Sequence, residues 1–331
     1  MIAYATDVEG DIEYWNRYVE FSAVLRRGQD GCVELDEGVH FVFGGDVVDQ
    51  SRGDTQVLSE LLSLKRRYPE RVHFIIGNRD ANKLRLRTEL GAAHLAARPL
   101  RGHPGPYWAQ CVRPECTLTE GELESNSASS RLQWILKYTM GAASAFEHRR
   151  AELAAREAGG DAHIHDDAVV HSFLDSMNEG GAMLEYLLQA SLAVRVGSGL
   201  FVHGGLPRAG RANWRPGWVP AWEPGSSERE MLPLEEWIQE LERLRSTAMS
   251  EYKASLSQEP GSDAWSISGG YLHPQPGCSL NQYCMRDLVD GTQQASVVYN
   301  GWLGDDYQPI DFDDAATTVT HTRRLWRTTW W

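Results

Sequence analysis

Short apolar runs alternate with segments of helical periodicity along the first part of the chain. Residues 2–6, 39–43 and 72–76 are apolar runs of strand length, and each ends at a polar or glycine-containing segment. Between them, residues 11–27 and 54–68 place apolar side chains at helical spacing. This order favours parallel pairing of the strands, with the loops gathered at the carboxyl ends of the strands. Binding sites of open α/β sheets form at that edge.

Helical patterns interrupt this alternation between residues 81 and 190. Residues 131–157, 166–177 and 180–189 each predict a helix, and they follow an irregular loop rich in Pro, Gly and Cys. We interpret residues 81–190 as a helical insertion, or cap, on an α/β core.

Strand patterns return after the insertion. Residues 192–196 and 199–202 predict two strands, residues 234–256 a long helix, and residues 295–299 a late strand. We therefore expect a single α/β domain that spans residues 1–331.

Polar residues with metal-binding groups follow four of the predicted strands. They are Asp7 and Glu9 after the first, Asp46 and Asp49 after the second, Asn78 and Asp80 after the third, and His203 after the strand at 199–202. Any one of the aspartates is explained by a turn or a helix cap, where Asp is favoured. Their joint order with Asn78 and His203 instead predicts one polynuclear metal site.

This set of ligands suits the hydrolysis of phosphate esters. Two divalent ions a few Å apart lower the pKa of a bridging water from about 15.7 to about 7, and they neutralise the phosphoryl oxygens. We expect Asp46 to bridge the ions, Asp7 to bind the first, and Asn78 and His203 to bind the second. Mixed nitrogen and oxygen ligands favour Mn, Fe, Zn or Co over Ca.

Composition and charge narrow the choice of partners. The chain of 331 residues has a formal net charge of -14, which argues against general binding of nucleic acid but not against a phosphorylated substrate beside bound cations. No apolar run approaches the length that crosses a bilayer, and the first predicted strand leaves no room for a targeting segment. Five cysteines without CxxC spacing are typical of reduced thiols, so we expect a cytoplasmic protein.

The order of the motifs resembles the calcineurin-like metallophosphoesterase superfamily, which includes protein serine/threonine phosphatases and symmetrical dinucleoside-tetraphosphatases. The family pattern is Asp-x-His, Gly-Asp-x-x-Asp, Gly-Asn-His-Asp/Glu, His and Gly-His-x-His. Asp7, Gly45-Asp46-x-x-Asp49, Gly77-Asn78-x-Asp80 and His203 stand at matching positions. The resemblance covers residues 1–80 and 192–303, and it implies a four-layer αββα sandwich of two sheets packed face to face with helices outside.

Two residues depart from this pattern. Glu9 replaces the histidine ligand of the first motif, and a carboxylate oxygen can take its place on a hard divalent ion. Arg79 replaces the histidine that acts on the leaving group. Arginine is no general acid, because its pKa exceeds about 12, but it can hold a phosphate oxygen through two N–H groups. We therefore expect a preference for phosphoanhydrides or aryl phosphates, whose leaving groups need little protonation.

The closing Gly-His-x-His motif is absent from the sequence. Residues 297–302 match it best by strand position, and Asn300 would then supply an oxygen in place of an imidazole. This substitution favours a site with one ion, or with a second ion that is weakly held.

Other candidate residues have a structural alternative. Arg79 and Asp80 are candidate catalytic residues, but a structural ion pair between them is the stronger interpretation of Asp80. Arg52 is a candidate contact to the substrate phosphate, although loop arginines are commonly solvated. His163 and His165 have the spacing of metal ligands, but they precede a predicted helix, which favours capping and exposure.

Two functions fit these observations. The favoured one is a phosphoesterase that hydrolyses phosphate monoesters or phosphoanhydrides with a metal-bound hydroxide, on a small molecule, a nucleotide or a phosphoprotein. The alternative is a catalytically weak or inactive relative that binds metal or phosphate as a regulatory or interaction module. The missing histidines support the alternative.

Overall fold

The computed structural model describes residues 1–103, 114–157, 163–205, 234–258 and 278–284, and the short segments 208–209, 213–214, 287–289, 292–294 and 296–298. A parallel sheet of order β1-β4-β5-β6 lies at its centre. The strands are β1 (Ile2–Ala5), β4 (His40–Phe43), β5 (Val72–Ile75) and β6 (Ala190–Ser191). Because a parallel sheet is covered on both faces, its strands are nearly continuous apolar runs, which is how the sequence located them. The α/β class and the parallel pairing are confirmed.

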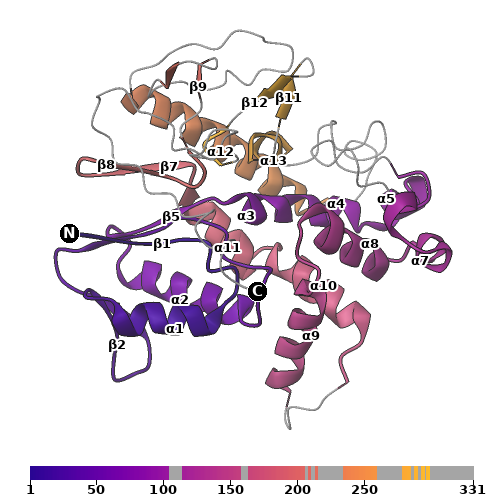
Figure 1. The fold of residues 1–331 in the computed structure, drawn as a ribbon, viewed down its shortest axis with the longest axis horizontal. Coiled ribbons are helices and arrows are strands. Elements are labelled where there is room, and N and C mark those ends of the chain that lie inside the picture. The colour runs from indigo at the N-terminus through magenta and orange to yellow at the C-terminus, as the bar shows by residue number, and fades with distance from the viewer. Residues whose placement is uncertain are drawn as a thin grey trace.

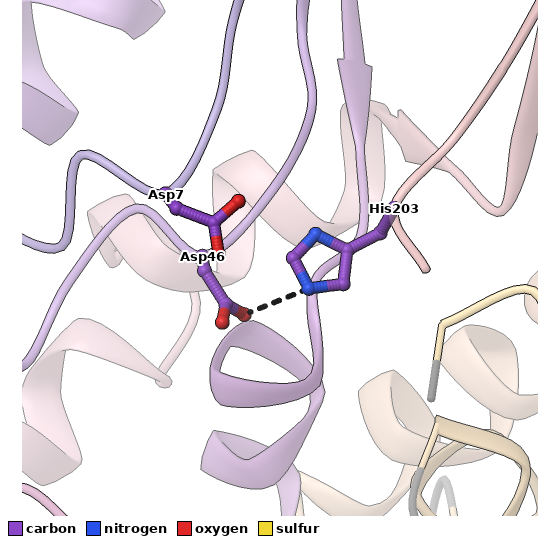
Figure 2. Close-up of side chains that lie close together, drawn as sticks. All are labelled: Asp7, Asp46 and His203. Atoms are coloured by element: carbon purple, nitrogen blue, oxygen red, sulfur yellow. Dashed lines mark ion pairs between the residues drawn. The ribbon is translucent and has the colours of Figure 1, made fainter. Parts of the chain in front are cut away.

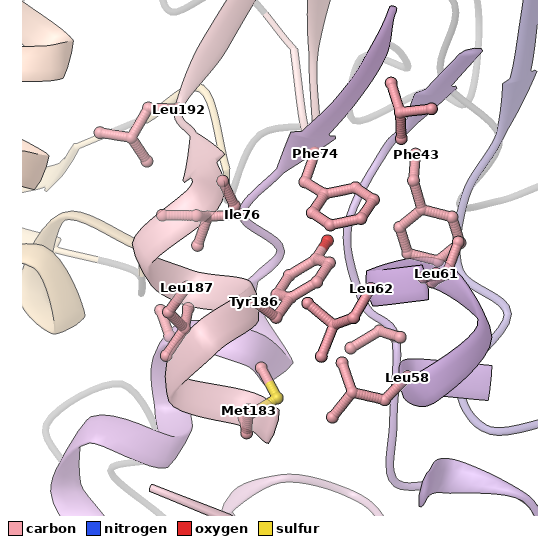
Figure 3. Packing of buried hydrophobic residues seen from close by; sticks show 14 of the residues in the cluster. Phe43, Leu58, Leu61, Leu62, Phe74, Ile76, Met183, Tyr186, Leu187 and Leu192 are labelled. Atoms are coloured by element: carbon pink, nitrogen blue, oxygen red, sulfur yellow. The ribbon is translucent and has the colours of Figure 1, made fainter. Parts of the chain in front are cut away.

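Three helices cover one face of the sheet (Figure 1). They are α1 (Ile12–Phe21), α2 (Asp54–Arg67) and α11 (Ala182–Gln189). The aromatic ring of Tyr186 stacks on that of Phe74, with 4.9 Å between the ring centroids (Figure 3). Tyr186 also makes an edge-to-face contact with Phe43. The Tyr186 hydroxyl donates to the carbonyl of Ile75 at 2.8 Å, which satisfies its polar atom within the core.

A hairpin of β7 (Ala193–Val196) and β8 (Gly199–Val202) packs on the opposite face. Val42 and Ile75 of the sheet form a second small cluster with Val196 and Phe201 of the hairpin. The long helix α12 (Leu234–Ser255) lies beyond, next to α13 (Cys278–Cys284) (Figure 1). In the part of the chain that the structure describes, three further two-stranded pairs are β2 (Leu25–Arg27) with β3 (Val33–Leu35), β9 (Arg208–Ala209) with β10 (Asn213–Trp214), and β11 (Asp287–Val289) with β12 (Thr292–Gln294).

Short helices between β5 and α11 form what we call the helical region, residues 78–176. They are α3 (Asn78–Asn82), a 3-10 turn (Lys83–Arg85), α4 (Leu86–Glu89), α5 (Ala92–Ala97), α6 (Pro114–Thr117), α7 (Glu120–Ser125), α8 (Ala128–Trp134), a π-helical turn (Ile135–Thr139), α9 (Ala145–Arg156) and α10 (Asp166–Ser176). It has a hydrophobic cluster of its own, which includes Leu86, Trp134 and Phe173. In contrast, α11 packs on the sheet.

Three predicted elements differ from the structure. The helix expected over residues 11–27 ends at Phe21, since Ser22 turns the chain by accepting from the amides of Val24 and Leu25. The helix expected over 131–157 is divided by the π-helical turn and by Gly141, whose φ is +64°. Residues 296–298 form a bend and not a strand, and Asn300 lies outside the described residues.

Candidate functional site

The ends of β1 and β4 run on side by side beyond the sheet. The amide of Asp7 donates to the carbonyl of Gly45 at 3.0 Å, and the amide of Glu9 donates to the carbonyl of Asp46 at 3.0 Å. These backbone bonds extend the parallel pairing into both loops. The first two motifs are therefore fixed to each other by main-chain contacts, whatever their side chains do.

Four acidic residues in these loops have left-handed backbone. The φ angles are 50° at Asp7, 48° at Glu9, 54° at Asp46 and 103° at Asp49. Such a conformation costs a non-glycine residue about 1–3 kcal/mol, and it persists where the surrounding structure enforces it. Strain of this kind clusters at functional sites, so its concentration at the strand ends marks this edge as the candidate site.

Two glycines allow the ends of β4 and β5 to touch. A Cβ built on Gly45, where φ is +96°, would lie 2.5 Å from the amide nitrogen of Gly77. A Cβ on Gly77 would lie 2.2 Å from Oδ1 of Asp46 and 2.3 Å from its amide nitrogen. Only glycine fits at either position, which gives a physical reason for the glycine in the second and third motifs.

Asp7, Asp46 and His203 converge at this edge from three separate segments (Figure 2). One ligand atom from each lies within 4.8 Å of the others, and Asp46 and His203 are fully buried. Nδ1 of His203 is 2.7 Å from the carbonyl oxygen of Gly44, which can only accept, so Nδ1 carries the proton. In the neutral ring Nε2 then presents a lone pair.

That lone pair of His203 faces oxygen atoms. Nε2 is 3.6 Å from Oδ1 of Asp46 and 3.3 Å from Oδ1 of Asn78. Imidazole nitrogen, carboxylate and carboxamide oxygens turned toward one point form a donor set that fits a divalent transition metal ion. The carbonyl of Gly44 orients the ring in the way that backbone partners commonly orient a metal-binding histidine.

Asp80 connects the loops that follow β4 and β5 through hydrogen bonds. Its carboxylate accepts from the amides of Asp46, Val47 and Gly77 at 2.8–3.0 Å. Burial and the nearby Asp46 raise the pKa of Asp80 to about 6, against the effect of the amide hydrogen bonds and His203. The structural ion pair expected between Asp80 and Arg79 is wrong, because Arg79 pairs with Glu9 and Asp46.

Arg79, which is buried, and Glu9, which is partly exposed, form an ion pair beside this donor set. Nε of Arg79 lies 2.7 Å from Oε1 of Glu9, and Nη1 donates to the carbonyl of Met140 at 2.8 Å. Burial raises the pKa of Glu9 to about 7; Arg79 opposes this rise, and Asp46 and Asp7 add to it. Burial lowers the pKa of Arg79, but the carboxylates of Glu9, Asp46 and Asp49 outweigh it, so the net shift is upward.

Further buried ion pairs lie near the site, and the sequence did not predict them. Lys83 pairs with Asp49 at 2.5 Å, and Arg149 pairs with Asp54 at 3.4 Å. Asp54 also accepts from the amide of Asp49 at 2.8 Å. Lys83 and Asp49 are 34 residues apart, and no local pattern in the sequence joins them. Nothing local in sequence pointed to Arg149.

The other expected residues are placed as follows. Arg52 is exposed on the loop that leads into α2. His163 and His165 are exposed, and His165 is the N-cap of α10, in agreement with the structural interpretation. Val297, at the start of the segment expected to carry the last motif, lies beside the residue that follows His203, since the amide of Gly204 donates to its carbonyl at 2.6 Å. Among the described residues, no helix is both long and apolar enough to span a bilayer.

Comparison with known proteins gives weak similarities. No family matches the sequence, and no curated protein does. Among solved structures, a protein serine/threonine phosphatase from Saccharomyces cerevisiae is 14% identical, with a TM-score of 0.27 over 62% of this chain and 38% of that chain. A cold-active protein-tyrosine phosphatase of the psychrophile Shewanella sp. is 14% identical, with a TM-score of 0.34 over 76% of this chain and 49% of that chain. This chain spans less than half the length of either, and such scores do not establish a shared fold.

Proposed function

We propose that this protein is a metal-dependent phosphoesterase that hydrolyses phosphate monoesters or phosphoanhydrides. The observation that carries the proposal is the convergence of Asp7, Asp46 and His203 within 4.8 Å, from segments far apart in sequence. Asn78 adds a carboxamide oxygen 3.3 Å from His203. Strained backbone at Asp7 and Asp46 holds the carboxylates in this arrangement.

These four residues would hold Mn, Fe, Zn or Co. A bound ion of this kind acidifies water and neutralises phosphoryl oxygens. The chain's own contribution is orientation. The Gly44 carbonyl sets the tautomer of His203, and the Arg79 amide fixes Asp46 by donating to its Oδ1 at 2.9 Å.

The substrate preference follows from Arg79. Its guanidinium stays protonated, so it supplies positive charge at the site but no proton for a leaving group. Phosphoanhydrides and aryl phosphates fit such a site, because their leaving groups need little protonation. Arg52, exposed on the neighbouring loop, is the candidate second contact to the phosphoryl group. Asp80 would act by positioning the loops.

The order of the four motifs supports membership of the calcineurin-like metallophosphoesterase superfamily. We include in the proposal its four-layer αββα sandwich, with residues 81–190 as a helical insertion within one domain. The parallel sheet, with α1, α2 and α11 on one face and the β7–β8 hairpin on the other, is consistent with half of such a sandwich.

Metal analysis and an aryl-phosphatase assay test the proposal. Protein purified without chelator should contain divalent metal and hydrolyse an aryl phosphate when Mn²⁺ is added. The Asp46→Asn variant should lose at least about 100-fold of both metal affinity and turnover, because changes to outer contacts of metal ligands alone cost 10–100-fold. The matched control is Asp30→Asn, which removes an exposed carboxylate and should change neither.

Two outcomes count against an enzyme. Bound metal with no turnover of aryl phosphates or phosphoanhydrides would favour the inactive, regulatory relative. The Glu9–Arg79 ion pair, which stands in the place of two family histidines, supports that alternative. Absence of metal from both the wild type and Asp46→Asn would contradict the proposed metal site itself.

A further inference from the structure

The two carboxylate oxygens of Asp46 face different cation positions. Oδ1 lies 3.6 Å from Nε2 of His203, on the side of Asn78. Oδ2 lies 3.7 Å from Nε of Arg79, on the side of Glu9. A carboxylate that bridges two cations is arranged in this way, but here one of its two neighbours is a guanidinium.

Glu9 is committed to that guanidinium. Its Oε1 accepts from Nε of Arg79 at 2.7 Å, and the arginine side chain is only 7% exposed. The carbonyl of Met140 holds Nη1 from the other end at 2.8 Å. Because both ends of the guanidinium are fixed, it cannot turn away to free Glu9 without leaving buried polar groups unsatisfied.

Resting on the proposed metal site, we infer that the protein binds one divalent ion and that the Arg79 guanidinium takes the place of a second. The ion lies between Asp7, Asp46, Asn78 and His203. Glu9 is the counterion of Arg79 and not a metal ligand. This assignment differs from the expectation that Glu9 replaces a histidine ligand of the metal.

The charges support one ion. Asp7, Glu9 and Asp46 can carry at most three negative charges, which one divalent ion and one guanidinium balance. A second ion about 3.5–4 Å from the first, the usual spacing in two-metal sites, would have to share Glu9 and Asp46 with the guanidinium. The like charges would repel each other strongly in this buried environment.

Manganese titration with a spectroscopic readout tests the inference. Wild-type protein should bind one Mn²⁺ per chain, with the electron paramagnetic resonance spectrum of an isolated ion. Arg79→Gln removes the guanidinium charge, so it should bind two ions and give a spin-coupled spectrum. Arg17→Gln removes an exposed arginine on α1 and should still bind one ion.

Two further variants separate the roles of the carboxylates. Glu9→Gln keeps an oxygen that can accept from Arg79, and it should change the dissociation constant of the first ion less than about 10-fold. Asp7→Asn should weaken it more than about 100-fold, beyond the range that outer contacts account for.

The possible results are distinct. Two tightly bound ions in the wild type, or a loss of affinity in Glu9→Gln as large as in Asp7→Asn, would overturn the inference and leave the proposed function intact. No bound ion in the wild type would overturn both. If Arg79→Gln fails to fold, the wild-type stoichiometry still tests the single ion, and the comparison of Glu9→Gln with Asp7→Asn still tests the role of Glu9.

Discussion

At the sheet edge carboxylates from separate strand ends face one another, whereas in the helical region the buried Glu89 lies against Arg85 at 2.6 Å. The pKa values follow this difference. Burial raises the pKa of Glu9 to about 7 in spite of Arg79. Burial also acts to raise the pKa of Glu89, but Arg85 outweighs it and the net shift is downward. The Arg85–Glu89 pair is neutralised within the helical region, whereas the sheet edge gathers the carboxylates of Asp7 and Asp46 beside His203.

The largest effect is expected from breaking the pair in the helical region. Arg85→Met leaves Glu89 buried without its partner, which should lower the free energy of unfolding by about 3–5 kcal/mol in urea denaturation. Adding Glu89→Leu should recover most of that loss. The control Arg66→Met breaks an exposed pair with Glu185 and should cost less than about 1 kcal/mol. A small loss in Arg85→Met would show that this pair is not structural.

Gly77→Ala should disturb the close contact between the backbones at the sheet edge. The added methyl group would lie 2.2 Å from Oδ1 of Asp46, so the loops must move apart at a cost of about 3 kcal/mol. Mn²⁺ affinity should fall with stability. Gly121 lies in α7, and a Cβ built on it would have no contact within 4 Å. Gly121→Ala should therefore stabilise the protein by about 0.5–1 kcal/mol. Equal unfolding midpoints for the two variants would contradict the close contact of the loops.

Metal should stabilise the sheet edge and leave Asp46→Asn unaffected. Binding to the folded state alone adds about 2.7 kcal/mol at a free Mn²⁺ concentration 100 times the dissociation constant. Thermal melting with and without Mn²⁺ measures this shift. An equal shift in Asp46→Asn would place the binding elsewhere.

The helical region should be the more sensitive to acid. Burial lowers the pKa of His103 to about 3, with Arg131 adding to the effect against Glu89. The unfolded chain, with a pKa near 6.5, therefore binds the proton first, and stability is lost as the pH falls below that value. Between pH 7 and pH 5 the loss should be about 2 kcal/mol. His103→Gln should unfold with less pH dependence over this interval, and an unchanged dependence would contradict the assignment.

Sequence pattern located the central strands because a parallel sheet is apolar on both faces. It also placed Asp7, Asp46 and His203 together, since parallel strands end at one edge. The β2–β3 hairpin was not predicted, because Leu25 fits the period of a helix as well as that of a strand. The pairing of Arg79 with Glu9 could not be predicted from the sequence, because the two residues are 70 positions apart. It also depends on left-handed backbone at Glu9, a conformation that the sequence would indicate only by a glycine at that position.

The turn after Ile135–Thr139 meets the strand-end loops through main-chain oxygens. Arg79 donates to the carbonyl of Met140, and the side-chain amide of Gln50 donates to the carbonyl of Gly141 at 3.1 Å. The side chain of Met140 takes no part in this attachment and packs in the hydrophobic cluster of the helical region. A residue other than glycine at position 141, where φ is +64°, would disturb it from a position outside the site. Backbone shape at one turn therefore acts together with the Glu9 carboxylate in holding the guanidinium.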